Sequence, residues 1–262
     1  MSVPKRHHYI AQMILRRFTD QRGLLYCHSR TDRHQSAWSS KPANVFAENH
    51  LYNVSIEKEF SALEGRVAVM IDEFVEAALC RRNPQLGLED RDVWFQFLVL
   101  QQRRVPDVAR PVVEANVDCL IEEIPAKIEN DIGRRLTSNE IAAFRKPDNQ
   151  ERLRKNAVAF FASAKPRRDF LNRLHGTSIE TALIGNPRKS FVCGSRPIAG
   201  FHEWFCVHQK VAVKLLPLSG LDQLVIFNSS SEIRRINHDI VNRSTFFAGP
   251  SRSLVESLAR PR

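Results

Sequence analysis

The segment that most constrains the fold is residues 89–104, which reads as a helix with apolar side chains over most of its circumference. Acidic residues open it and arginines close it, as the helix dipole favours, and Pro106 follows its end. Its apolar residues are Val93, Trp94, Phe95, Phe97, Leu98, Val99 and Leu100. A helix that is apolar on most sides has to be covered on most sides. We therefore expect this helix at the centre of the core.

A helical body is predicted around it. Residues 56–82 carry apolar side chains at helical spacing, and Asn83 and Pro84 end that helix. Further helices are expected over residues 107–136, 139–145, 150–163 and 166–174, the first of them broken or kinked near Pro111 and Pro125, with a cap at Ser138.

The pattern changes at Thr177, where short apolar runs between turn residues predict strands. The runs are 181–184, 190–193, 204–208, 211–216 and 223–228, followed by helices over 231–243 and near Leu254. Near the N-terminus, residues 24–30 and 34–40 predict a hairpin, and residues 44–53 predict a loop or a single turn. We predict an α+β fold in a single domain, residues 1–262. It has a large helical body at about 56–175 and a small, mostly antiparallel sheet from the N-terminal hairpin and the C-terminal strands, about 20–55 plus 177–250.

The charge balance points to an acidic partner. Lysine and arginine number 39 against 29 acidic residues, a formal net charge of +10, and 29 of the 39 cations are arginines. The planar guanidinium suits bidentate recognition of phosphate. Nucleic acid, RNA or DNA, is therefore the leading partner class, and a protein partner is a further possibility. The alternative is a high-GC genome, which enriches arginine without any binding role.

Several protein classes are disfavoured. No apolar stretch approaches the about 20 residues of a membrane span, and the polar start does not resemble a secretory signal, so we expect a cytoplasmic protein without membrane contact. Five scattered cysteines without a C-x-x-C pair argue against disulfides and thiolate zinc, and we expect buried, reduced thiols. The chain has neither a Walker loop nor a G-x-G-x-x-G motif.

The densest group of chemically capable side chains lies at the start of the chain. Residues 5–18 read as an amphipathic helix, on which His8, Gln12 and Arg16 share one face. Adjacent histidines on a helix point about 100° apart, so we expect His8 rather than His7 on that face. A histidine there could act as a general base or a metal ligand. The alternative is an exposed or capping histidine.

Carboxylates on the predicted helix 56–82 are the second candidate group. Glu57 and Glu64 are two turns apart on one face, about 10 Å, so they cannot share one metal ion unless other elements complete its shell. The alternative is a solvated acidic face. Two further groups are weaker: Gln101 to Arg104 could reach an anion or only meet the helix dipole, and Glu48, His50 and Tyr52 could line up in an extended segment or serve as core and ion-pair residues.

Taken together, these residues resemble a bacterial and phage family named domain of unknown function 4238. The likeness is carried by Lys5 to Tyr9, Gln12, Leu15 to Phe18, Asn44-Val45, Glu48, Tyr52, Ile56-Glu57, Leu63 to Gly65, Gln102 to Arg104 and Pro106, and continues in Phe191 to Ile198, Leu216 to Ser219, Asn237 and Asn242-Arg243. The resemblance implies one site built from His7, His8, Gln12, Arg16, Glu57, Glu64 and Arg104.

The chain departs from the family pattern at two positions. Ala11 replaces a usual proline, and Ser195 stands where a Ser-Asp-Asn/His-Pro stretch has its aspartate. If that aspartate is catalytic or binds a metal, this protein is a weakened or inactive relative.

The leading functional hypothesis is a nucleic-acid-directed hydrolase, a nuclease, with a divalent metal as a possible cofactor and a role in defence or as a toxin. Its predicted catalytic residues are His8, Glu57, Glu64 and His7, and its predicted substrate-binding residues are Lys5, Arg6, Gln12, Arg16, Gln102 and Arg104. The first alternative is a non-catalytic nucleic-acid- or partner-binding module. The second is a structural subunit whose arginines meet an acidic protein.

Overall fold

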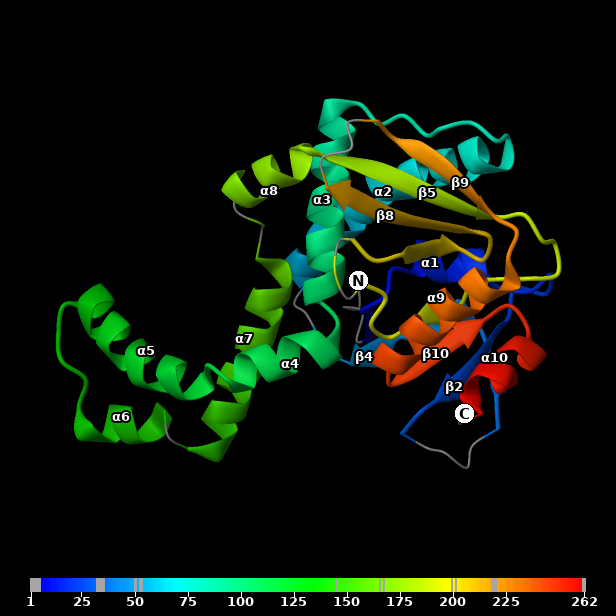
Figure 1. Ribbon diagram of the computed structural model, residues 1–262. Coiled ribbons are helices and arrows are strands. Elements are labelled where there is room, and N and C mark those ends of the chain that lie inside the picture. The colour runs from blue at the N-terminus through cyan, green and yellow to red at the C-terminus, as the bar shows by residue number, and fades with distance from the viewer. Residues whose placement is uncertain are drawn as a thin grey trace.

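The computed structural model describes residues 6–31, 36–49, 51, 54–144, 146–164, 166, 168–198, 200, 202–217 and 221–260. It confirms the α+β class (Figure 1). None of its helices, within these ranges, has the length and apolar character needed to span a membrane.

The apolar helix predicted at 89–104 is α3 (Leu88–Arg103), and it lies in the core as expected. It packs against α2 (Val54–Leu79), α4 (Pro106–Glu114), α7 (Pro147–Ser163) and α8 (Arg168–His175). Its fully buried Trp94 lies with its ring centroid 5.1 Å from that of Phe74 in α2 and 6.3 Å from that of Phe205 in the C-terminal region. Aromatic contacts on both sides therefore join the helical and strand-rich parts.

Three helices extend to one side of the molecule, away from the sheets: α5 (Val117–Ile132), α6 (Ser138–Phe144) and part of α7 (Figure 1). Pro111 and Pro125 lie inside α4 and α5, and the two helices are separated at residues 115–116, so the chain breaks near Pro111 but not at Pro125. On surface helices, water can hydrate the carbonyls that lose their partners to proline.

Within the described residues, the strands form two four-stranded sheets and one two-stranded ladder, where one sheet was expected. In the first sheet β5 (Thr177–Ile184) lies between antiparallel β8 (Val211–Pro217) and parallel β9 (Gln223–Phe227), with β7 (Phe205–His208) outside β8. The second sheet has the order β3 (Trp38–Ser40), β2 (Leu25–Ser29), β10 (Phe246–Gly249), β6 (Cys193–Gly194). The predicted hairpin is correct and consists of β2 and β3. Strand β10, which the sequence pattern did not predict, pairs with β2 on one side and with β6 on the other.

The two C-terminal helices are α9 (Ser230–Arg243) and α10 (Arg252–Ala259). Helix α9 crosses β6 so closely that a Cβ added to Gly194 would lie 2.2 Å from the Ser244 Oγ and 2.8 Å from the Ile240 Cγ2. Only glycine fits at that crossing.

The N-terminal segment differs most from expectation. Residues 5–18 are not one helix: β1 (Arg6–His8) is a strand, followed by the single turn α1 (Gln12–Leu15) and a 3₁₀ turn, η1 (Arg16–Phe18). Strand β1 pairs antiparallel with β4 (Ala47–Asn49), which lies in the segment expected to be a loop and follows the 3₁₀ turn η2 (Pro42–Asn44). Pairing with a distant segment has overridden the local helical pattern.

The cysteines follow the prediction in part. All five are free; Cys27, Cys193 and Cys206 are buried, and burial raises the pKa of the Cys27 and Cys193 thiols to about 12. Cys80 and Cys119 are exposed, contrary to expectation, because one follows the end of α2 and the other lies on the outlying helix α5.

Candidate functional site

The site is built on strand β1, which sends neighbouring side chains to opposite faces. His7, opposite Glu48 in the ladder, is buried, whereas His8, opposite Ala47, is only partly buried. The strand is held at its end by two backbone contacts. The Tyr9 amide donates to the Phe46 carbonyl at 2.9 Å, and the buried Gln101 of α3 donates from Nε2 to the Tyr9 carbonyl at 2.7 Å.

Arg104 organises the acidic side of the site. Its side chain is only 3% exposed, and it pairs with the Glu64 carboxylate of α2 and donates to the Gln101 Oε1. Its guanidinium carbon also lies 5.4 Å from the centroid of the Phe60 ring. Arg104 was predicted to bind substrate. Its guanidinium instead contacts Glu64 and Gln101 and positions both side chains.

Glu57 lies two helical turns before Glu64 on α2, and both act on the same group of side chains. Burial raises the pKa of the Glu57 carboxyl, and the charge of Glu64 raises it further. Interactions with His7 and Arg104 act in the opposite direction, which places both side chains within electrostatic reach of Glu57. Glu57 is therefore easier to protonate than an exposed glutamate.

His8 lies at one end of a chain of polar contacts with α1 and η1. The Gln12 Nε2 is 3.3 Å from the His8 Nδ1 and 3.4 Å from its Nε2, and the exposed Arg16 donates from Nη2 to the Gln12 Oε1 at 3.2 Å. The predicted adjacency of His8, Gln12 and Arg16 is therefore present, although a strand followed by one helical turn creates it.

Burial lowers the pKa of the His8 imidazole below its usual 6.5. The carbonyls of Pro42 and Ala43 oppose this shift, Arg6 adds to it, and Glu64 opposes it. The imidazole is consequently neutral at pH 7, the state that a general base requires.

We refer to His7, His8, Gln12, Arg16, Glu57, Glu64, Gln101 and Arg104 as the N-terminal cluster. Within the described ranges, no three or more His, Cys, Asp or Glu side chains lie close enough to hold a metal ion. The cluster instead provides an imidazole, two carboxylates and an exposed guanidinium, which can exchange protons and contact an anion.

Other predicted residues lie outside the cluster or serve other contacts. Arg6 is exposed and donates to the Asn44 carbonyl at 2.6 Å. Gln102 is half-buried. Glu48 pairs with Arg110, as its ion-pair interpretation predicts. Lys5, His50 and Tyr52 lie outside the described residues.

Arg103, which precedes Arg104 in the predicted anion-binding group 101–104, contacts other parts of the protein. It donates to the Ala164 carbonyl at 2.9 Å, and its guanidinium carbon lies 5.6 Å from the Phe161 ring centroid.

Ser195 makes contacts that the sequence did not predict. Its buried hydroxyl donates to the Asp107 Oδ2 at 3.2 Å, and the Thr245 hydroxyl donates to the same oxygen at 2.8 Å. Asp107 also helps to raise the pKa of the Tyr9 phenol, an effect caused mainly by burial. A carboxylate is therefore present beside Ser195, supplied by the first turn of α4. The position of Asp107 directly after Pro106 was the one available sequence signal.

Comparison with known proteins agrees with the resemblance noted in the sequence. The family model described as protein of unknown function (DUF4238) matches residues 6–183. This range includes every residue of the N-terminal cluster. No curated protein and no solved structure matches the chain.

Proposed function

This chain belongs to the DUF4238 family, and we propose that it is a nucleic-acid-directed hydrolase, a nuclease, with the N-terminal cluster as its reaction centre. The observation that carries the proposal is the run of contacts from His8 through Gln12 to Arg16, within electrostatic reach of the Glu64 carboxylate of α2. A neutral imidazole, protonatable carboxyl and exposed guanidinium are the groups that phosphodiester hydrolysis needs.

In the proposed reaction, His8 accepts a proton from the attacking water as its oxygen bonds to phosphorus. The bond from phosphorus to the leaving oxygen breaks, and that oxygen takes a proton from the Glu57 carboxyl. The raised pKa of Glu57 and the lowered pKa of His8 favour these starting protonation states. Both residues return to those states by proton exchange with water.

Arg16 is the proposed phosphate contact. It is exposed, and its donation to Gln12 leaves further N–H groups of its planar guanidinium directed elsewhere. Negative charge builds on the phosphoryl oxygens during attack, so a guanidinium aimed at them stabilises the transition state more than the substrate. Glu64 and Arg104 hold the carboxylate side of the cluster in place as positioning residues.

The decisive experiment measures turnover. Labelled RNA and DNA are incubated with the purified protein in Mg²⁺, Mn²⁺ or a chelator, which also establishes whether a divalent ion takes part. We expect cleavage of at least one substrate, with a rate at least about 100-fold lower in His8→Ala. The matched control is His238→Ala, a histidine on α9 outside the cluster, which should keep the wild-type rate.

The second candidate is a non-catalytic nucleic-acid- or partner-binding module. The burial of Arg104 in an ion pair favours it, because one of the predicted phosphate clamps is already satisfied by Glu64. Intact RNA and DNA under all metal conditions, together with measurable binding, would establish this alternative and exclude the nuclease.

A further inference from the structure

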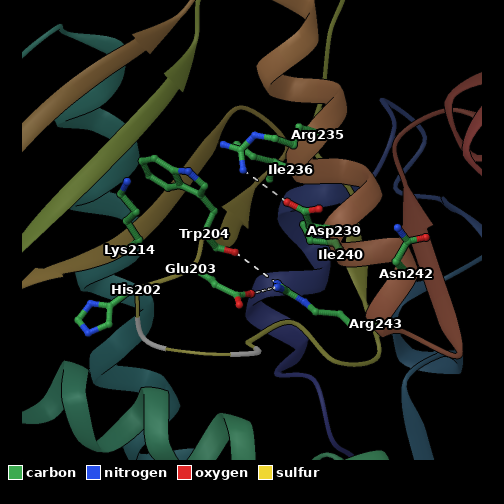
Figure 2. Close-up of a pocket in the computed structure, with 10 residues that line it drawn as sticks. All are labelled: His202, Glu203, Trp204, Lys214, Arg235, Ile236, Asp239, Ile240, Asn242 and Arg243. Atoms are coloured by element: carbon green, nitrogen blue, oxygen red, sulfur yellow. Dashed lines mark hydrogen bonds and ion pairs between the residues drawn. The ribbon is translucent and has the colours of Figure 1, made fainter.

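A cavity of about 690 Å³ lies in the C-terminal half of the chain, between α9, strand β8 and the segment 202–204 that precedes β7. Figure 2 shows Trp204 and Lys214 on one wall and Arg235, Ile236 and Asp239 of α9 on the other. Its volume falls in the range of small-molecule sites, about 300–1,000 Å³. The N-terminal cluster contributes no residue to it.

Trp204 is held in one position by its neighbours. Its ring centroid lies 5.4 Å from that of Phe227, with the two rings 83° apart, and the Lys214 ammonium lies 4.4 Å from its centroid. Lys214 is fixed in turn by an ion pair with the buried Glu180 at 2.5 Å. An indole that is already ordered can pack against a ligand at little further entropic cost.

Arg243 lines the cavity beside Glu203, as Figure 2 shows. Its Nε donates to the Arg196 carbonyl at 3.0 Å, its Nη2 donates to the Pro197 carbonyl at 2.7 Å, and it pairs with Glu203. These contacts tie α9 to the segment before β7, so Arg243 shapes the cavity.

Arg235 is the cation that is free to meet a ligand. Its side chain is 65% exposed, and its nearest acidic partner, Asp239, lies at 3.6 Å and is itself 54% exposed. Such a surface pair contributes little and exchanges readily for another anion. In Figure 2 the guanidinium extends from α9 across the cavity toward the Trp204 indole.

We propose that this cavity binds a nucleotide, either free or as one unit of a single-stranded nucleic acid. The base packs between the part of the Trp204 indole that lines the cavity and the aliphatic wall of Ile236 and Ile240, and the phosphate meets Arg235. An aromatic platform beside a guanidinium is the combination by which proteins hold unpaired nucleotides. The proposal stands independently of the nuclease function.

The test is calorimetric titration of the full chain with AMP and with adenosine. AMP should bind at least tenfold more tightly than adenosine. Arg235→Ala should weaken AMP binding about tenfold and leave adenosine unchanged, and Trp204→Leu should weaken both. Arg234→Ala, an exposed neighbour on α9 that does not line the cavity, is the matched control and should change neither.

A short single-stranded oligoadenylate separates the two sources of nucleotide. Tighter binding than AMP, weakened by Arg235→Ala, assigns the cavity to a nucleic-acid strand, whereas equal or weaker binding assigns it to a free nucleotide. AMP contains no phosphodiester linkage between nucleosides, so its binding does not depend on nuclease activity. The proposal is overturned if neither ligand binds at millimolar concentration, or if Arg235→Ala binds AMP as the wild type does. Because Arg235 is a surface residue, this variant should fold even if Trp204→Leu does not.

Discussion

Arg104 is the residue on which the geometry of the N-terminal cluster depends most. It joins α2 to the end of α3 through Glu64 and Gln101, and its side chain is almost fully buried. A buried charge is stabilising only while its partners are present, and each partner left alone remains desolvated.

Arg104→Ala should therefore lower the free energy of unfolding by about 3–5 kcal/mol, because it leaves Glu64 and the buried Gln101 without their partner. Urea unfolding followed by circular dichroism measures the change. Arg66→Ala, which removes an exposed arginine from α2, should alter stability by no more than about 0.5 kcal/mol. Equal effects of the two substitutions would show that Arg104 is not an organising residue.

His208 predicts a pH dependence of stability. Burial lowers the pKa of its imidazole to about 4, and Arg17 and Lys210 lower it further against the opposing charge of Asp72. Its Nδ1 accepts a hydrogen bond from the Lys210 amide at 3.0 Å, which requires an unprotonated nitrogen. The unfolded chain takes up this proton near pH 6.5, before the folded protein does.

Stability should thus fall as the pH is lowered from about 6.5 to 4, with His208 contributing at most about 3 kcal/mol. The measurement is urea unfolding at several pH values in wild type and His208→Asn, whose side-chain oxygen can still accept from the Lys210 amide. The variant should show a flatter profile in this window. An unchanged slope would mean that His208 titrates normally.

Among the helices and strands, the sequence best predicts the buried helices, because burial sets the spacing of their apolar residues. The apolar residues of α3 and the helical spacing in α2 predict the bounds of α3 to within one residue and those of α2 to within three. The prediction of one N-terminal helix over residues 5–18 was wrong. The apolar run from Ile10 to Phe18 is helical for only two short turns, and residues 6–8 pair with a strand some 40 positions away. No local pattern reports a partner at that distance.

Helix α6 offers a test of a local signal. Its cap is Thr137 rather than the predicted Ser138: the Thr137 Oγ1 accepts from the Glu140 amide at 3.3 Å, and the Glu140 carboxylate accepts from the Thr137 amide at 2.8 Å. This is a capping box. Thr137→Ala should destabilise α6 locally by about 1 kcal/mol. Hydrogen exchange should detect faster exchange in α6 alone, with α3 unchanged as the internal control. Unchanged exchange in α6 would refute the cap.

At the scale of the whole molecule, the charge of +10 should govern association with nucleic acid. If the protein contacts about six phosphates, its affinity should fall roughly a thousandfold between about 50 and 200 mM salt, because each contact releases condensed counterions. Fluorescence anisotropy with labelled RNA and DNA across this range measures the slope. Absence of any binding at low salt would instead support a structural subunit that meets an acidic protein.

The candidate site was predictable in its membership more than in its geometry. The sequence indicated His8, Gln12 and Arg16 as neighbours, and contacts link these three, whereas Glu64 acts on His8 through its charge. It did not indicate that Arg104 would be buried against Glu64, or that Ser195 would meet Asp107. Both contacts join segments far apart in the chain, and their polar residues look the same in sequence whether they face water or one another.

The account depends most on His8 acting as the general base. The direct measurement is the rate of cleavage of labelled RNA and DNA as a function of pH, in wild type and in His8→Ala. We predict a wild-type rate that rises with pH as His8 loses its proton, through a midpoint below 6.5, and falls again at higher pH as the Glu57 carboxyl loses its proton, with a rate at least about 100-fold smaller in the variant. No cleavage by the wild type, or an undiminished rate in His8→Ala, would contradict the proposed chemistry.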